Sequence, residues 1–477
     1  MSGWREKIYD RVPIPVQNGI LSWHGRRMLR ERFGPEYDKL MSFFEESQWY
    51  SREELEAYRA ERLEHLIQHV YETVPYYHDI MSDRGLTPAD IRTEGDLAKL
   101  PVLTKHDVRE NRSRLLSTSC DRGSLREAYT SGSTGPPIGV FWDSSVTVVN
   151  NACLWRCRKW GGFEFGRPYA GLLVHPIVPE PQNRPPYWRW NESWNQLLLS
   201  SLHLKEDTVA EYVAEMRRVG VEALETYPSS AYVFAKYMEA VGERLPLTCV
   251  FTTSEPLLDV QREVVEDRFC CPVFDAYSQA ERVMFSGECD RHVGHHVHEE
   301  YGITELLDGQ DEPVAPGRMG RVVATGLHNF AMPLIRYEVG DAAAFRVSPC
   351  ECGRGLRLLE GVSTKADDIL VLPDGRLLPP PAFMRAFKGF PGIEQIQVVQ
   401  HEPQSVTVRM ACTDEFASGS EQGIRDNLRM RFGDDVGIVF EYVDMIPRSS
   451  RGKFRTVIST VPLSWGDVST SNLYQSD

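Results

Sequence analysis

A loop rich in glycine and hydroxyl side chains reads Tyr129-Thr-Ser-Gly-Ser-Thr-Gly-Pro-Pro137. Gly132 and Gly135 can adopt positive φ angles and expose successive backbone N–H groups. The hydroxyl side chains add donors, so the pattern predicts a loop that binds phosphate oxygens, formed by Thr130, Ser131, Gly132, Ser133, Thr134 and Gly135. It lacks the G-x-x-x-x-G-K-[ST] pattern of P-loop ATPases. A flexible surface turn is the alternative interpretation.

A second group combines cysteine and histidine, the residue types that bind zinc. Its members are Cys289, His296, Cys350 and Cys352. Thiolate and imidazole donors suit tetrahedral Zn²⁺, and four protein ligands leave no open position, so the group predicts a structural site. His292, His295 and His298 compete for the histidine position. The alternative is a set of unliganded thiols, because C-x-C spacing is less specific than C-x-x-C.

Two further segments have side chains suited to a nucleotide. Residues 275–281 offer an aromatic plane at Tyr277 for a flat base and a carboxylate at Glu281 for a hard cation. Residues 333–341 end in Asp341, whose two oxygens can accept both hydroxyls of a vicinal diol. Taken alone, each segment could also be an ordinary buried tyrosine or surface carboxylate. The interpretation as a nucleotide site therefore depends on the order of the segments along the chain.

In this order the segments resemble the acyl-adenylate-forming superfamily, and within it the phenylacetate-CoA ligase group with its shorter relatives from capsule polysaccharide and natural-product pathways. The resemblance covers nearly the whole chain. The loop is similar to T-S-G-[ST]-T-G-x-P, with Ile138 where many superfamily members have lysine. Ser278 and Ala280 depart from Y-G-x-T-E, and Lys365 replaces the arginine of R-x-D-D-x-L. Residues 447–455 resemble the tail P-R-x-x-x-G-K-x-R, which contains Lys453.

The resemblance implies a role for each matching residue. Tyr277 would pack on adenine, Glu281 would hold Mg²⁺, and Asp341 would accept both ribose hydroxyls. Lys453 is the catalytic candidate, because a lysine there neutralises charge on the substrate carboxylate and the α-phosphate in the transition state. Lys365 would contact the ribose or the phosphates. The segments that would line the adenine pocket contribute Ser254, Glu255, Ala276 and Ser278.

The implied reaction has two steps. A carboxylic acid attacks the α-phosphate of MgATP to give an acyl-adenylate and pyrophosphate, and a lid movement then lets a second nucleophile take the acyl group. Coenzyme A is the expected nucleophile and an amine is the alternative, which would make the enzyme an amide ligase. A non-catalytic nucleotide-binding homologue is a third hypothesis. On family analogy the acid is aromatic, and Trp190, Tyr227 and Ser229 are candidates for its pocket.

The elements that position these residues follow from periodicity and from glycine and proline positions. Residues 51–74 predict an amphipathic helix that ends before Pro75, and residues 208–220 a second helix with a capping box at Thr208. Short apolar runs between helices indicate an α/β domain with buried strands. Beyond the acidic pair 367–368 the pattern becomes β-β-α-β. We expect a large α/β domain over residues 1–366 and a small α+β lid over 367–477.

Composition restricts the function further. The chain has 477 residues, too many for one core, and 53 basic against 68 acidic side chains give a net charge of −15. Nucleic acid is therefore an unexpected partner. The start of the chain lacks the apolar stretch of a signal peptide, and no long apolar run predicts a membrane span, so we expect a cytoplasmic protein. A homodimer is compatible with these features.

Overall fold

The structure is a computed structural model. It describes residues 9–129, 138–173, 177–255, 257, 259–318, 320–360, 370–374, 377–378, 383–387, 389–417, 419–446 and 457–461. The predicted phosphate loop, Lys365 and Lys453 lie outside these residues. The joint predicted at 366/367 does so too, and the domain boundary stays a prediction.

A twelve-stranded sheet forms the centre of the described part of the large domain. Its spatial order is β11-β12-β13-β14-β10-β9-β8-β7-β6-β3-β5-β4. Strands β5, β3, β6, β7 and β8 are mutually parallel, and the pairs beyond β8 are antiparallel. In chain order the strands are β3 (Tyr169–Leu172), β4 (Trp188–Asn191), β5 (Gln196–Leu199), β6 (Ala223–Thr226), β7 (Cys249–Thr253), β8 (Val273–Ser278), β9 (Phe285–Glu288), β10 (His295–Val297), β11 (Gly302–Leu307), β12 (Gly320–Gly326), β13 (Tyr337–Phe345) and β14 (Leu358–Glu360).

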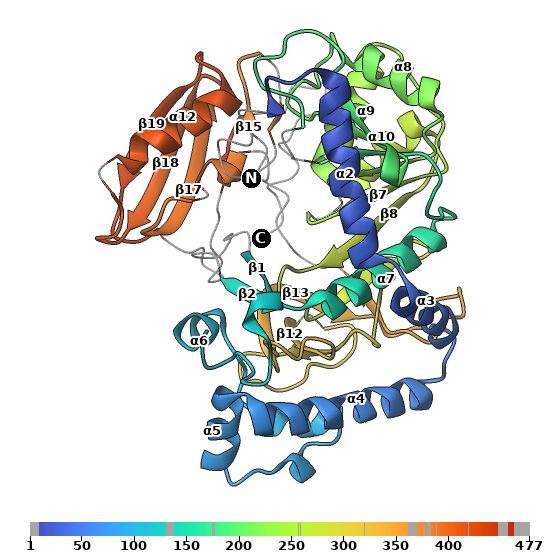
Figure 1. The fold of residues 1–477 in the computed structure, drawn as a ribbon, viewed down its shortest axis with the longest axis vertical. Coiled ribbons are helices and arrows are strands. Elements are labelled where there is room, and N and C mark those ends of the chain that lie inside the picture. The colour runs from blue at the N-terminus through green and yellow to red at the C-terminus, as the bar shows by residue number, and fades with distance from the viewer. Residues whose placement is uncertain are drawn as a thin grey trace.

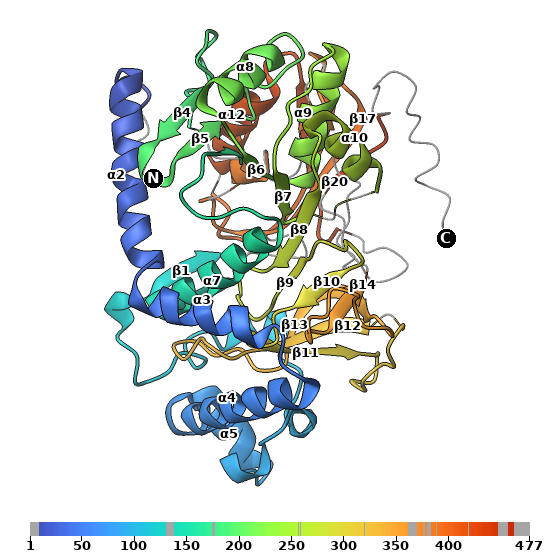
Figure 2. The same ribbon diagram turned by 90° about the vertical axis from the view of Figure 1, so that its right-hand side faces the viewer.

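Helices cover both faces of the parallel strands (Figures 1 and 2). Along β7, Val250 packs with the helices α8 and α9, whereas Cys249 and Phe251 pack with α3 and α7. This alternation is expected of a strand buried on both faces. The helices are α2 (Ile14–Arg32), α3 (Pro35–Ser47), α4 (Arg52–Thr73), α5 (Pro75–Asp83), α6 (Lys105–Glu110), α7 (Ser144–Trp160), α8 (Val209–Val219), α9 (Pro228–Ala240) and α10 (Asp259–Phe269), with the short 3₁₀ turns η1 (Pro88–Asp90), η2 (Glu94–Lys99), η3 (Arg122–Ser124) and η4 (Glu192–Trp194).

Both helices expected from periodicity are present. Helix α4 begins after Ser51, which forms a capping box with Glu54, and ends before Pro75. Helix α8 ends at Gly220, whose φ of 69° is the left-handed conformation that glycine favours. The capping box predicted at Thr208 is wrong, because its hydroxyl group donates to the carbonyl groups of His203 and Lys205 instead.

The hairpin of β1 (Arg126–Tyr129) and β2 (Gly139–Trp142) brackets the predicted phosphate loop. The two strands pair in antiparallel register, with Tyr129 opposite Gly139. Both ends of the loop are therefore fixed next to each other, and β2 leads directly into α7 (Figure 1).

The C-terminal segment forms its own sheet and core. Strands β17 (Ile393–Glu402), β18 (Ser405–Cys412), β19 (Gly437–Tyr442) and β20 (Val457–Ser459) lie in the order β19-β18-β17-β20, with α12 (Ser420–Phe432) packed against them. The short strands β15 (Leu370–Val371) and β16 (Leu377–Leu378) and the turn η5 (Arg385–Phe387) complete it. The predicted β-β-α-β pattern is present. Within the described residues, no helix is long and apolar enough to cross a bilayer.

Candidate active site and metal centre

Three neighbouring parallel strands end at the same edge of the sheet with predicted site residues. Tyr227 follows β6, Ser254 and Glu255 follow β7, and residues 276–278 are the last of β8. The pairing of Thr253 with Ala276 places the second and third groups side by side. Ser254 has a φ of 72°, so the chain turns sharply there. The carboxyl ends of parallel strands are where α/β proteins bind ligands, and the adenine segments predicted from the sequence therefore meet at one place.

Two tyrosine–carboxylate hydrogen bonds join this edge to β13. The Tyr277 hydroxyl donates to Asp341 Oδ2 at 2.7 Å, and the Tyr337 hydroxyl donates to Glu281 Oε1 at 2.6 Å. Tyr277 and Glu281 belong to β8 and the turn after it, whereas Tyr337 and Asp341 belong to β13. Each segment thus contributes one donor and one acceptor. The structure brings Tyr277, Glu281 and Asp341 together, as the sequence analysis expected.

Both tyrosines remain hydrogen-bond donors at neutral pH. Burial raises the pKa of Tyr277, and the charge of Asp341 adds to the effect. Burial also raises the pKa of Tyr337, and the charge of Glu281 acts in the same direction. A protonated hydroxyl group therefore donates to one oxygen of each carboxylate.

Asp275 links the end of β8 to the neighbouring strands. Thr252 Oγ1 donates to Asp275 Oδ1 at 2.5 Å, and His295 Nε2 lies 3.3 Å from Oδ2. The backbone N–H of Asp275 donates to Glu288 Oε2 at 3.1 Å. Burial raises the pKa of Asp275 against the opposing effect of His295. These contacts join the four neighbouring strands β7, β8, β9 and β10 immediately before Tyr277.

Two residues at this site, Tyr337 and Lys105, are not predicted from the sequence. Tyr337 stands inside the motif that ends at Asp341, and its position there was the available signal. Lys105, at the start of α6, had no signal. Its Nζ lies 3.1 Å from where a Cβ atom on Gly340 would be, and Gly340 has a φ of 95°. A glycine is needed at this position because it allows both the left-handed backbone and the close approach of the lysine.

The predicted metal ligands form one cluster. The ligand atoms of Cys289, His296, Cys350 and Cys352 all lie within 4.8 Å of one another. Cys289 Sγ is 3.7 Å from Cys350 Sγ, and Cys352 Sγ is 3.3 Å from His296 Nε2. Tetrahedral zinc with Zn–S bonds of about 2.3 Å has S···S edges of about 3.8 Å. The four donors therefore already have nearly the spacing of a tetrahedral site.

Surrounding groups orient these donors. His296 Nδ1 lies 3.2 Å from the Leu356 carbonyl oxygen, which favours a proton on Nδ1 and leaves Nε2 as a ligand atom. The backbone N–H groups of Arg291 and Arg354 point to Cys289 Sγ and Cys352 Sγ, each at 3.5 Å. Burial lowers the pKa of His296 to about 4, so its ring is neutral at physiological pH.

The competing histidines make other contacts. His292 Nδ1 lies 3.2 Å from Glu288, His295 pairs with Asp275, and His298 Nε2 lies 3.4 Å from Cys157 Sγ. Of the four histidines considered, His296 is the one whose ring nitrogen joins the three cysteines. The tertiary structure therefore selects a ligand among candidates that the sequence left open.

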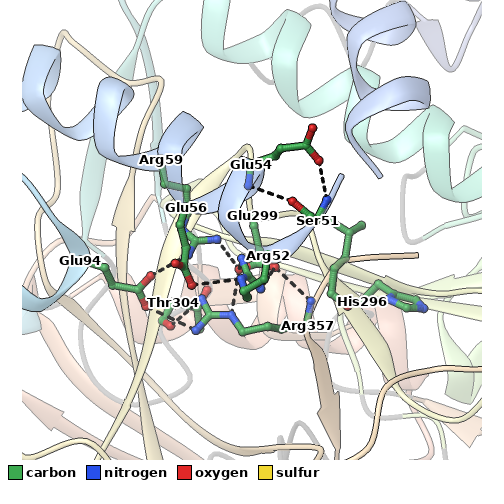
Figure 3. A network of polar contacts seen from close by, with 11 residues as sticks. Ser51, Arg52, Glu54, Glu56, Arg59, Glu94, His296, Glu299, Thr304 and Arg357 are labelled. Atoms are coloured by element: carbon green, nitrogen blue, oxygen red, sulfur yellow. Dashed lines mark hydrogen bonds and ion pairs between the residues drawn. The ribbon is translucent and has the colours of Figure 1, made fainter. Parts of the chain in front are cut away.

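A buried ionic network lies close to His296 (Figure 3). Glu299 is fully buried and accepts hydrogen bonds from Arg52 at 2.7 and 2.9 Å, from Arg59 at 2.5 Å and from Arg357 at 2.8 Å. Glu94 accepts from Arg59 at 3.0 Å and from Arg357 at 3.3 Å. Helix α4 is thereby fastened to the segments that precede β11 and β14. Burial of Glu299 would raise its pKa, but the three arginines overcome this effect and lower the pKa to about 2.

The remaining predicted residues are distributed differently. Tyr227 contacts the core of the C-terminal segment from the end of β6. Ser229 lies in the first turn of α9. Trp190 lies on the edge strand β4, where it lines a cavity of about 460 Å³ together with residues of α2. The structure does not bring Trp190 to the ends of β6, β7 and β8, and its predicted role in the acyl pocket stays untested.

Comparisons with known proteins agree with this geometry. Residues 370–460 match the family model of the CapK C-terminal domain. The chain is 23% identical to protein CapK of Staphylococcus aureus, over 95% of this chain and 99% of that protein. It is 24% identical to the phenylacetate-coenzyme A ligase of Thermus thermophilus, over 88% and 99% of the two chains.

A solved structure with the same fold is 2-hydroxyisobutyryl-CoA ligase in complex with 2-HIB-AMP and CoA in the thioesterification state. The TM-score is 0.57 and the identity 17%, over 86% of this chain and 91% of that chain. The postadenylation state of the same ligase gives a TM-score of 0.53 at 18% identity, over 86% and 90% of the chains. The expected fold class, a large α/β domain followed by a small α+β domain, is confirmed.

Proposed function

Because the chain belongs to the adenylate-forming superfamily, within the family of protein CapK and the phenylacetate-CoA ligases, we propose that it activates a carboxylic acid with ATP. The products of the first step are an acyl-adenylate and pyrophosphate, and the acyl group then passes to CoA as a thioester. The observation that carries this proposal is the pair of hydrogen bonds that place Tyr277, Glu281 and Asp341 at one edge of the sheet.

Each of these residues has a defined task in the proposed first step. Tyr277 presents its ring to adenine while its hydroxyl group holds one oxygen of Asp341. Asp341 accepts from the ribose hydroxyls. Ser254, Glu255, Ala276 and Ser278 line the adenine pocket from the ends of β7 and β8. These contacts fix the nucleotide so that its α-phosphate faces the carboxylate of the acid.

Phosphate chemistry needs positive charge and N–H donors. The loop Thr130–Gly135 supplies donors to the leaving pyrophosphate, and Lys453 neutralises charge as the carboxylate attacks the α-phosphorus and the bond to the bridging oxygen breaks. Glu281, whose Oε1 accepts from Tyr337, would hold Mg²⁺. Mg²⁺ would neutralise phosphate charge when bound. Lys365 contacts the ribose or phosphates in this scheme.

The acceptor in the second step is proposed to be CoA. The ligase structure with this fold contains both an acyl-adenylate and CoA. An amine acceptor, which would make the protein an amide ligase, is the alternative. A non-catalytic nucleotide-binding homologue is less compatible with the joint retention of Glu281, Asp341 and Lys453. An aromatic acid, a pocket that includes Tyr227, Ser229 and Trp190, a homodimer and a cytoplasmic location remain parts of the proposal.

We also propose that Cys289, His296, Cys350 and Cys352 hold a structural Zn²⁺. Support comes from the donor set and from its near-tetrahedral spacing. Four protein ligands leave no position for a substrate, so the ion would link β9, β10 and the β13–β14 connection and take no part in the reaction.

The experiment measures pyrophosphate release with MgATP across a panel of aromatic and aliphatic acids, with and without CoA, and identifies products by mass spectrometry. Acyl-CoA formation supports the proposal. An acyl-adenylate that accumulates in the presence of CoA supports the amine alternative instead. Lys453→Ala should lower adenylation at least about 100-fold, whereas Lys39→Ala, on the exposed face of α3, should not. An unchanged rate in Lys453→Ala would refute the mechanism.

A further inference from the structure

Three arginines from distant parts of the chain meet next to the proposed active site. Arg32 ends α2, Arg126 begins β1, and Arg282 follows Glu281 directly. Trp142 connects two of them. It lies opposite Arg126 in the β1–β2 register, and its ring centroid is 4.1 Å from the guanidinium carbon of Arg282. Directly opposite residues of two paired strands point to the same face, so Arg126 and Arg282 share one surface of the hairpin.

Helix α7 and residue Glu31 bring Arg32 to the same place. Arg126 forms an ion pair of 2.6 Å with Glu31, the neighbour of Arg32 in the chain. Arg282 Nη1 donates to Thr147 Oγ1 at 3.3 Å. One turn further along α7, Asn151 Nδ2 donates to the carbonyl oxygen of Arg32 at 3.3 Å. The same helix face therefore supports the backbone of Arg32 and the side chain of Arg282.

The cluster contains more positive than negative charge. Glu31 pairs with Arg126, but within the described residues no carboxylate forms an ion pair with Arg32 or Arg282. Burial lowers the pKa of Arg32 against the opposing charge of Glu225, a carboxylate that forms its ion pair with Arg158 at 2.7 Å. A partly buried cation without a counterion is costly, so the arrangement favours a bound anion.

Aromatic rings surround these charges. Arg32 lies 5.6 Å from the ring centroid of Trp194, and Arg282 lies on Trp142. Trp142 is 6% exposed, and within the described part of the chain its indole Nε1 is buried without a hydrogen-bond partner. A buried donor of this kind is normally satisfied. An acceptor oxygen on a ligand would satisfy the indole N–H group of Trp142 and the N–H donors of Arg32 and Arg282.

We propose that Arg32, Arg126 and Arg282 bind a second anionic group of the substrate acid, such as a carboxylate, phosphate or sulfonate distant from the carboxylate that is adenylated. The location supports this assignment. Arg282 adjoins Glu281, and Arg126 is four residues before Thr130 at the start of the predicted phosphate loop. The inference rests on the proposed function and defines its substrate class as acids with two anionic groups.

The test compares matched acids with one or two anionic groups, for example phenylacetate and 4-carboxyphenylacetate, or butanoate and succinate. The assay is ATP–pyrophosphate exchange, which needs no CoA. The wild-type protein should prefer the dianionic member of at least one pair by at least about 10-fold in kcat/KM. Arg282→Gln and Arg32→Gln should each lower kcat/KM for that acid about 10- to 100-fold and change the monoanionic acid little.

Two controls keep the test decisive. Arg122→Gln, on the exposed turn η3, should leave both acids unchanged. Arg282→Lys retains the charge and should recover part of the preference for the dianionic acid. A preference for monoanionic acids throughout, or an equal loss for both members of a pair, would overturn the inference. Variants that leave the exchange rates unchanged and raise only the KM for CoA, measured separately as acyl-CoA formation, would assign the arginines to the CoA phosphates, which also overturns it.

Failure of the proposed function can be told apart from failure of this inference. Calorimetric titration of the dianionic acids into wild-type protein and Arg282→Gln requires no turnover. If no acid supports exchange but a dianionic acid binds the wild-type protein and not the variant, the anion site stands and the proposed activity falls. If acids support exchange without regard to their second charge, the activity stands and the anion site falls. Absence of both exchange and binding refutes both.

Discussion

Replacing Tyr337 with phenylalanine removes one oxygen atom from the proposed active site. The lost hydroxyl group donates to Glu281 Oε1 at 2.6 Å, and both side chains are buried. A hydrogen bond to a charged group contributes about 1.5–3 kcal/mol. At 1.36 kcal/mol per factor of ten, this corresponds to about a 10- to 150-fold effect on an equilibrium or rate constant. The expected result is a loss of adenylation rate in this range.

The assay is ATP–pyrophosphate exchange at a series of Mg²⁺ concentrations. Without the Tyr337 hydroxyl group, the carboxylate of Glu281, which would hold Mg²⁺, loses a hydrogen bond that orients it, so the Mg²⁺ concentration at half-maximal rate should rise. The pKa of Tyr337 is raised by burial and by the charge of Glu281, so its hydroxyl group stays protonated and the difference should persist throughout the neutral range.

Tyr212→Phe is the matched control. Its hydroxyl group is also buried and donates to the Ser200 carbonyl group at 2.8 Å, but within the core around α8. This change should reduce stability by about 0.5–1.5 kcal/mol and leave the Mg²⁺ dependence unchanged. If Tyr337→Phe and Tyr212→Phe lose the same amount of activity with the Mg²⁺ dependence of the wild-type protein, Tyr337 does not position the metal ligand and the reasoning fails.

Two further predictions concern stability. Purified protein should contain about one equivalent of zinc, and far less bound metal would remove the proposed site. Either chelation or Cys350→Ser should lower the midpoint temperature of unfolding by at least about 5 °C. Cys270→Ser, which changes an exposed thiol, should leave this temperature unchanged. The folded structure lowers the pKa of Glu299 from its ordinary 4.5 to about 2. Its ionised form therefore adds about 3 kcal/mol to the free energy of unfolding. This contribution is fully present above about pH 5 and is lost as the pH falls toward 2. Urea unfolding of Glu299→Gln against the exposed control Glu263→Gln should show a deficit at pH 7 that shrinks below pH 4, and a deficit independent of pH would contradict the assignment.

Helix boundaries could be predicted from the sequence where a capping residue, a glycine or a proline marks the end of the helix. Ser51, Glu54 and Pro75 delimit α4, and Gly220 ends α8. The cap at Thr208 failed because the preceding turn takes its hydroxyl group, and that turn depends on packing around His203 rather than on the four residues of the motif.

Residues of the candidate site could be predicted where they stand inside a sequence motif, but their partners in other segments could not. Tyr277, Glu281 and Asp341 could be singled out because each stands in a recognisable segment. The bond from Tyr337 to Glu281 spans 56 residues, and the network around Glu299 joins residues 240 to 247 positions apart. No local pattern specifies such partners. The same reason explains why Arg282 and Lys105 were missed and why the zinc histidine stayed open until the fold was known.

The spacing of the metal ligands along the chain determines when the site can form during synthesis. Cys289 and Cys350 are 61 residues apart, so at about 5–20 residues per second a ribosome needs roughly 3–12 s to make the second after the first. During that interval an ion could bind only Cys289 and His296, and β11, β12 and β13 emerge before the set is complete. Tight binding of the proposed Zn²⁺ would therefore be a late event in biosynthesis. It would follow completion of β13, the strand that carries Asp341, and a chain that stalls before Cys352 lacks one of the four proposed ligands.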